Sequence, residues 1–216
     1  MARQAIRFDL LTNARDSLRR AISLLTWDED HTEHATLKHA ITNAAHAIEL
    51  LLKERLRREN PAFVWQNVDK FPNLDAQTVT TQTAMSRLKV VCGINFDEAD
   101  VKTVTALRNT RNAIEHYEWN ATESEARVIV GKALSFAFGF SEEHLGIDLS
   151  QDFKRDDTWR LLIEQAEAFT AAHSDRVKSK APNTYLDICS VCGQETVPAL
   201  GSCLLCGHWQ PMLSDL

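Results

Sequence analysis

Apolar residues recur at helical spacing along most of this 216-residue chain. The strongest such stretch spans residues 34–60, where apolar side chains three or four positions apart form one wide face. It ends in a cluster of cations followed by Pro61. Cations suit the negative end of a helix dipole, and proline cannot continue a helix. No stretch before residue 177 alternates clearly enough to predict a strand, so we expect an all-α main body.

The same spacing predicts further helices over residues 6–25, 75–94, from about Val101 onward, 126–140 and 158–176. The stretch 126–140 is apolar on nearly every side, so it should be a central core helix. We expect a bundle of four to five main helices over residues 1–175. The polar, proline-containing segment "VKSKAPNT" predicts a linker over residues 176–186, followed by a small separate module over residues 187–216.

Composition is that of an ordinary globular protein, with 44% hydrophobic and 25% charged residues, which is enough to bury a core. The net charge of −6 argues against a general basic coat for nucleic acid, although it leaves room for a local basic groove. There is no apolar run of about 18 residues and no secretory signal at the N-terminus. We therefore expect no membrane span and a cytoplasmic location.

Four of the five cysteines lie in the last 28 residues, as two C-x2-C pairs that are each followed by glycine. They are Cys189, Cys192, Cys203 and Cys206. A two-residue gap lets both thiolates of a pair point at one ion, and the glycine permits the left-handed turn that such a knuckle needs. The pattern predicts a closed, structural Zn²⁺ site and resembles a zinc ribbon. Disulfides are the alternative, which a reducing compartment disfavours.

The segment "LRNTRNAIEHYEW", residues 107–119, concentrates polar chemistry on one predicted helix. Asn112 and His116 are four residues apart and share a face, and Arg108 lies one turn earlier on that face. Arg111 sits about 140° around the helix from His116. Arg111 and Glu115 could also form a plain surface ion pair. A solvated helix face and an active site are therefore both open interpretations.

The hexapeptide "RNAIEH", residues 111–116, resembles the R-x4-6-H motif of HEPN domains, with a polar residue directly after the arginine. The long helix expected over residues 34–60 is similar to the second helix of that family, and the resemblance covers roughly residues 5–172. It implies an HEPN-like helical bundle. It also implies a homodimer in which two copies of the motif face each other across one cleft.

The resemblance further implies an endoribonuclease that leaves 2′,3′-cyclic phosphate ends and needs no metal for catalysis. His116 would be the general acid or base, and Arg111 would hold the scissile phosphate. Asn112 would orient the histidine or the phosphate. Toxin or antiphage defence is the expected setting, with a possible antitoxin or other protein partner. The zinc ribbon would steer the choice of substrate or partner. A non-catalytic HEPN module that binds RNA, nucleotide or protein is the alternative, and an unrelated bundle is the third.

Substrate RNA also has to be attracted to the site. Arg108 precedes the motif, and Lys53, Arg57 and Arg58 put cations on the end of the 34–60 helix. We expect these four residues to contact the RNA backbone. Ordinary solvated charges are the other interpretation.

Overall fold

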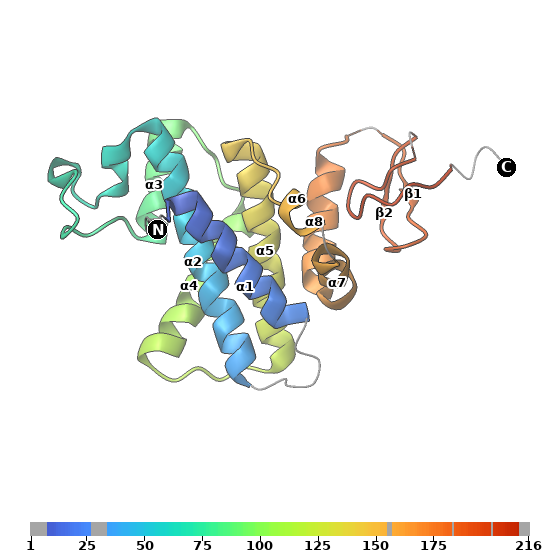
Figure 1. The fold of residues 1–216 in the computed structure, drawn as a ribbon, viewed down its shortest axis with the longest axis horizontal. Coiled ribbons are helices and arrows are strands. Elements are labelled where there is room, and N and C mark those ends of the chain that lie inside the picture. Colours follow the sequence, from blue (N-terminus) through green and yellow to red (C-terminus); the bar gives the residue numbers. More distant parts are fainter. Residues whose placement is uncertain (1–7, 27–33, 155–156, 183, 200, 212–216) are drawn as a thin grey trace, which may run out of the picture.

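The computed structural model describes residues 8–26, 34–154, 157–182, 184–199 and 201–211 of the chain. This part forms eight α-helices, two short 3-10 helices and one two-stranded sheet (Figure 1). The prediction of an all-α bundle followed by a small module is confirmed. The elements are α1 (Leu10–Thr26), α2 (His34–Glu59), η1 (Pro61–Val64), η2 (Val68–Lys70), α3 (Thr81–Cys92), α4 (Glu98–His116), α5 (Glu123–Leu145), α6 (Gln151–Lys154), α7 (Thr158–Gln165), α8 (Glu167–Ser179), β1 (Asp187–Ile188) and β2 (Glu195–Val197).

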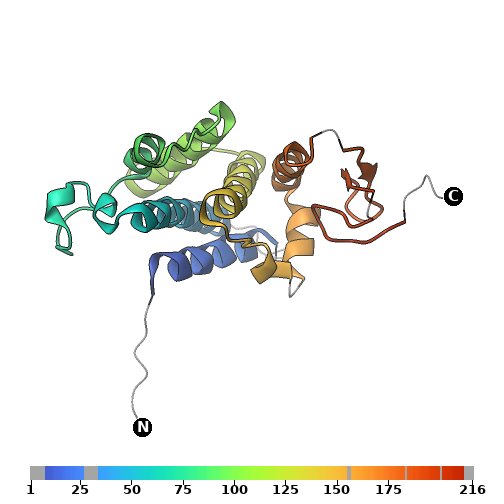
Figure 2. The ribbon, with the colours of Figure 1, turned by 90° about the horizontal axis from the view of Figure 1, so that it is seen from above.

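Helix α5 is the centre of the bundle, as its apolar sequence predicts. It packs against α2, α4 and α8, while α1 packs along α2. Figures 1 and 2 show α8 between α5 and the C-terminal module. A capping box starts α5: the Thr122 side chain accepts from the backbone of Glu125, and the Glu125 side chain accepts from Thr122. This cap fixes where the chain turns back after α4, and so where the polar end of α4 lies.

Helix α4 begins at an aspartate cap. The Asp97 side chain accepts a hydrogen bond from the backbone of Asp100 at 2.6 Å. Gly93, at φ 67°, ends α3 in the left-handed conformation that glycine tolerates best. Helix α4 then runs to His116, and the backbone N–H of Tyr117 donates to the carbonyl of Ala113. The whole "RNAIEH" motif therefore lies in the last two turns of α4.

One helix expected over residues 158–176 is instead two. The break is at Ala166, whose backbone (φ −108°, ψ 73°) is not helical. The Thr170 hydroxyl donates to the carbonyl of Ile163 at 2.7 Å, which satisfies an acceptor that the interrupted helix leaves open. Helix α8 also continues to Ser179, so the linker does not begin at residue 176. The segment is polar, but it is helical for one more turn.

Gly131 allows α8 to lie close against α5. A Cβ added at Gly131 would stand 2.7 Å from the backbone nitrogen of Phe169 and 3.2 Å from Ala168 atoms. The shortest of these contacts is with backbone, so the helices would have to separate. We expect Gly131→Ala to lower the free energy of unfolding by about 1–3 kcal/mol, the usual cost of overpacking a core. Urea unfolding would measure it. Gly146→Ala is the contrasting variant, because a Cβ there meets nothing and any loss comes from its φ of 65°.

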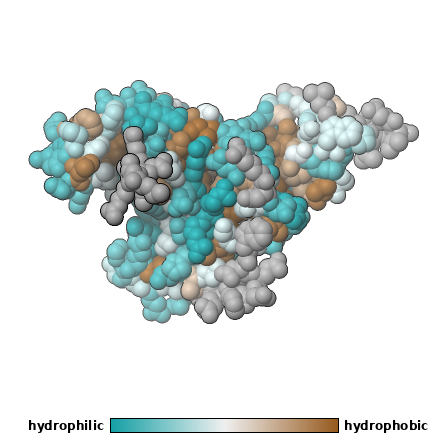
Figure 3. Space-filling view, viewed as in Figure 1, coloured by the Kyte–Doolittle hydropathy of each residue, from teal (hydrophilic) through white to brown (hydrophobic). Residues whose placement is uncertain are grey.

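Most of the molecular surface visible in Figure 3 is hydrophilic, with hydrophobic side chains in smaller patches. None of the helices in the described part of the chain combines the length and the apolar character that a membrane span requires.

Candidate functional site

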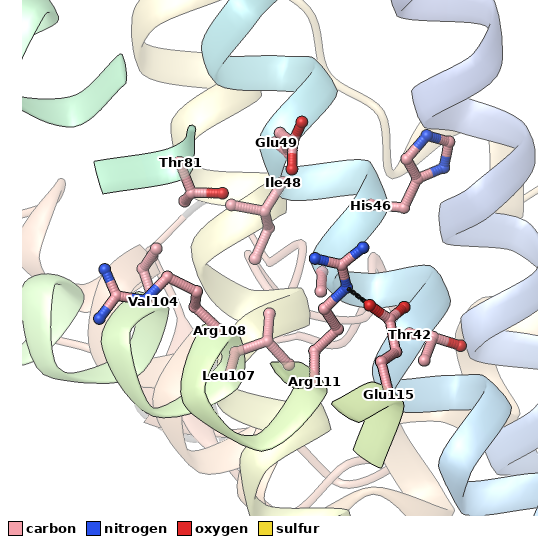
Figure 4. Close-up of a pocket in the computed structure, with 11 residues that line it drawn as sticks. Thr42, His46, Ile48, Glu49, Thr81, Val104, Leu107, Arg108, Arg111 and Glu115 are labelled. Atoms are coloured by element: carbon pink, nitrogen blue, oxygen red, sulfur yellow. Dashed lines mark ion pairs between the residues drawn. The ribbon is translucent and has the colours of Figure 1, made fainter. Parts of the chain in front are cut away.

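The last turns of α4 border a cleft between α2, α4 and the first turn of α3 (Figure 4). The cleft has a volume of about 190 Å³. Arg108, Arg111 and Glu115 line it from α4. The α2 side contributes Thr42, Ala45, His46, Ile48 and Glu49. The predicted RNA-contacting residue Arg108 and the predicted phosphate ligand Arg111 therefore share one cleft.

A single carboxylate oxygen links the arginine and the histidine of the motif. Glu115 Oε2 lies 2.7 Å from Arg111 Nε and 3.9 Å from His116 Nε2. The i, i+4 ion pair expected between Arg111 and Glu115 is thus present. The His116 side chain is 65% exposed and that of Arg111 is 41% exposed, so a ligand can reach both. The sequence did not single out Glu115 as the link, although its spacing from Arg111 was the available signal.

The two arginines that line the cleft point in different directions. Arg108 donates to the side chains of Gln82 (2.6 Å) and Asn109 (3.0 Å), and Figure 4 shows its guanidinium turned away from that of Arg111. Asn112 Oδ1 accepts a long contact of 3.5 Å from Arg111 Nη1. The motif residues therefore meet around Arg111, with Arg108 to one side.

His46 lines the cleft from α2. Its Nδ1 lies 3.0 Å from the hydroxyl of Ser17 on α1, and Figure 4 shows the ring turned toward α1. This contact explains its place in the bundle and does not bring the ring to Arg111.

The other three predicted substrate-binding cations do not line this cleft. Lys53 is 7% exposed, pairs with Glu49 and donates to the Thr78 hydroxyl at 2.9 Å. Arg57 and Arg58 both bind Glu54, at 2.7 and 2.9 Å. Arg58 also donates to the carbonyl of Leu145. Lys53 and Arg58 therefore join the end of α2 to Thr78 and to Leu145, whereas Arg57 pairs within α2.

The carboxylate of Glu54 makes this role testable. Its side chain is only 2% exposed. Burial raises the pKa of a carboxyl, but the hydrogen bonds and charges of Arg57 and Arg58 outweigh burial, so the pKa of Glu54 lies below its ordinary 4.5. A lowered pKa stabilises the fold above the unfolded pKa, and this contribution is lost as pH falls through the folded pKa.

We expect Glu54→Gln to lower the free energy of unfolding by about 1–3 kcal/mol at pH 7, the range for hydrogen bonds to charged groups. The difference from wild type should shrink as pH falls below 4.5, the ordinary value. Urea unfolding at several pH values measures both effects. Glu98→Gln, which removes an 83% exposed partner of Lys102, should change little. A loss at Glu54 that does not vary with pH would contradict this assignment.

The four C-terminal cysteines form one cluster. Their sulfur atoms all lie within 4.8 Å of one another, and they could hold a metal ion. The sulfurs of Cys189 and Cys206 are 3.6 Å apart, and those of Cys192 and Cys203 are 3.7 Å apart. A disulfide bond is about 2.05 Å long, so all four are free thiols. Backbone amides point at the sulfurs, from Cys206 to Cys203 at 3.3 Å and from His208 to Cys206 at 3.4 Å.

The surroundings of this cluster favour negative charge on the sulfur of Cys203. Hydrogen bonds from the Cys206 thiol, and with it the Thr196 hydroxyl, lower the pKa of Cys203 to about 4 despite burial. Burial raises the pKa of Cys192 to about 11. A cluster that already stabilises one thiolate and crowds three more sulfurs around it has the donor set of a closed tetrahedral metal site. The residues present therefore fit a structural metal ion.

The second knuckle also fastens the module to the helices. Leu205, which stands between two of the cysteines, is 1% exposed, and its carbonyl accepts from the indole nitrogen of Trp159 on α7 at 3.0 Å. An ion pair of 3.3 Å joins Lys178 on α8 to Glu195 on β2. The module is thus packed on α7 and α8. The cysteine spacing could predict the cluster, but it could not predict this contact.

The chain matches no family model, no curated protein and no solved structure at a significant level. Its function therefore has to be argued from the site itself.

Proposed function

We propose that this protein is an HEPN-type endoribonuclease that acts as a homodimer without a catalytic metal and leaves 2′,3′-cyclic phosphate ends. The supporting observation is the arrangement at the end of α4. Arg111 lines a cleft, and Asn112 Oδ1 lies 3.5 Å from Arg111 Nη1. Glu115 Oε2 lies 2.7 Å from Arg111 Nε and 3.9 Å from His116 Nε2. A cytoplasmic role in toxin or antiphage defence is part of the proposal and rests on the motif.

In the proposed reaction, His116 takes the proton of a ribose 2′-hydroxyl, and the 2′-oxygen attacks the adjacent phosphorus. The bond from phosphorus to the 5′-oxygen breaks, and the leaving oxygen takes up a proton, from the histidine of either copy. Arg111 donates to the phosphate oxygens as their charge develops. In the single chain the Glu115 carboxylate pairs with Arg111 at Nε, so the phosphate competes with this carboxylate for the positive charge of the guanidinium. The exposed His116 ring leaves room for a second copy to face it.

A non-catalytic binding module is the second candidate. The observation that favours it is the ion pair itself, because a satisfied Arg111 is a poor phosphate ligand until Glu115 is displaced. Such a module would bind RNA, nucleotide or protein through the same cleft and turn nothing over. A protein partner, including an antitoxin, could occupy the same surface.

For the C-terminal module we propose Zn²⁺ as the metal. Four sulfur ligands in two C-x2-C knuckles are the preferred set for tetrahedral zinc, and a closed set has no open position for catalysis. The ion would therefore supply folding energy and not chemistry. The module would then serve substrate or partner choice from its place on α7 and α8.

A cleavage assay on single-stranded RNA and transfer RNA tests the enzyme proposal. The buffer would hold one equivalent of Zn²⁺ per chain and no other divalent ion, so that the module stays intact. We expect cleavage that leaves cyclic phosphate ends and is unchanged by added Mg²⁺. The rate per chain should fall when the protein is diluted below the dissociation constant of the dimer. RNA binding without cleavage would favour the binding module.

A further inference from the structure

A second cleft lies where α5, α6, α7 and α8 meet the four-cysteine module. Its volume is about 220 Å³, roughly seven times the share of one water molecule in the liquid. Phe138, Trp159 and Leu205 give it an apolar side, and Lys154, His173 and Lys180 give it a polar side. The cleft borders none of the residues of the "RNAIEH" motif, so it is independent of the proposed nuclease site.

His173 is the unusual residue of this cleft. It is 6% exposed, and its ring stacks on Phe169 at 5.1 Å and meets Phe138 and Trp159 edge-on. Its Nδ1 is buried without a hydrogen-bond partner. Because Nδ1 is shut in and the residue still lines the cleft, the ring edge that carries Nε2 faces the cavity. A buried nitrogen without a partner tolerates a lone pair better than an N–H, which favours the hydrogen on Nε2.

Burial and the nearby cations keep the His173 ring neutral, so its Nε2–H is an uncharged donor. Burial, and then the cations of Arg176, Lys180 and Lys154, lower the pKa of His173 to about 3. Lys180 is paired with Glu142, and Asp148 is satisfied by Ser150 and Gln151. The charge of Lys154 acts on the carboxylate of Asp148, which also lines the cleft, but no salt bridge to Lys154 is formed within the described part of the chain, and its ammonium lies 5.3 Å from the centroid of the Trp159 ring.

We propose that this cleft binds a small oxyanion, a carboxylate or a phosphate group carried on a compact body, with His173 Nε2–H and Lys154 as its two donors. An oxygen anion satisfies the buried donor and the unpaired ammonium together. The apolar wall formed by Phe138, Trp159 and Leu205 takes the rest of the ligand. Because Leu205 belongs to a cysteine knuckle, the ligand would contact the helices and the module at once.

The test uses the full, metal-loaded chain with benzoate and with inorganic phosphate as probes, followed by ligand-observed NMR and by thermal unfolding. We expect one or both to bind and to raise Tm. His173→Phe keeps the ring stack and removes the donor, and Lys154→Met removes the ammonium without touching the core. Each should weaken binding about tenfold to a hundredfold, the loss expected for one hydrogen bond to a charged group. Lys132→Met on α5, which lines a different groove, is the matched control and should bind as wild type does.

Stability separates this role from a structural one. A phenylalanine at position 173 leaves no buried nitrogen without a partner, so His173→Phe should raise Tm while it weakens binding by the stated factor. A folded, more stable and weaker-binding variant would support the proposal. The preferred probe would distinguish a carboxylate from a phosphate ligand. Absence of binding by both probes to the wild type at tens of millimolar, or equal binding in all variants, would overturn it.

Discussion

His116→Ala is expected to lower the RNA cleavage rate by about 10²–10⁴-fold, the usual contribution of a general acid or base. Arg111→Ala should cost about 10²–10³-fold, the range for a lost donor to a developing oxyanion. Neither change should disturb the fold, because His116 is 65% exposed and, among the described residues, Arg111 pairs with Asn112 and Glu115 of its own helix. Initial rates on a short RNA, with circular dichroism and sizing of each variant, measure this. Lys102→Ala, a 74% exposed cation at the other end of α4, is the matched control.

Glu115→Gln separates the two candidate functions at the same site. It removes the carboxylate that holds Arg111, and an exposed pair of this kind is worth about 0.2–1 kcal/mol. RNA affinity should therefore rise by up to about fivefold. In an enzyme, the rise appears as a lower KM with His116 still required for turnover. In a binding module, affinity rises and no variant cleaves. Cleavage that survives both His116→Ala and Arg111→Ala would remove α4 as the active site.

Local patterns predicted the features that depend on local spacing. The apolar stretch 126–140 had to be surrounded, and α5 is surrounded by α2, α4 and α8. Two C-x2-C pairs predicted one cluster, and the four sulfurs form one. The spacing of Arg111 and Glu115 predicted their ion pair. In each case the signal lies in one short stretch of sequence, with the four cysteines no more than seventeen residues apart, so the sequence carries it directly.

Features that depend on contacts between distant elements were not predictable in this way. The spacing from Glu54 to Arg57 and Arg58 allows ion pairs within α2, but it does not show that Glu54 is buried or that Lys53 reaches Thr78, because both depend on the packing of α2 against other elements. The break at Ala166 is accompanied by a hydrogen bond from the Thr170 hydroxyl to the carbonyl of Ile163, seven residues earlier in the chain. His173 looks like one more residue of an amphipathic helix until Phe138, Trp159 and Phe169 close around it.

Removing the metal is expected to have the largest effect on the structure. Chelation of the bound ion, or Cys203→Ser, should unfold the C-terminal module while the helical bundle stays folded. The module has only β1, β2 and a few buried side chains, and structural Zn²⁺ supplies about 10–16 kcal/mol of apparent binding energy in zinc-finger peptides. We expect one Zn²⁺ per chain by elemental analysis. Rapid proteolysis after Lys178 or Lys180 should follow chelation, with little loss of helical circular dichroism.

The fifth cysteine provides the matched control for this result. Cys92 lies at the end of α3, outside the cluster, and Cys92→Ser should keep one metal ion per chain and full protease resistance. Release of the module should also free the Trp159 indole from the carbonyl of Leu205. Chelation should therefore shift the tryptophan fluorescence of the wild type, and the part of this shift that comes from Trp159 should be missing in Trp159→Phe. A metal-free chain that resists protease as well as the loaded chain would show that packing on α7 and α8 holds the module without the ion. The bound ion would then contribute little to the folding of the module.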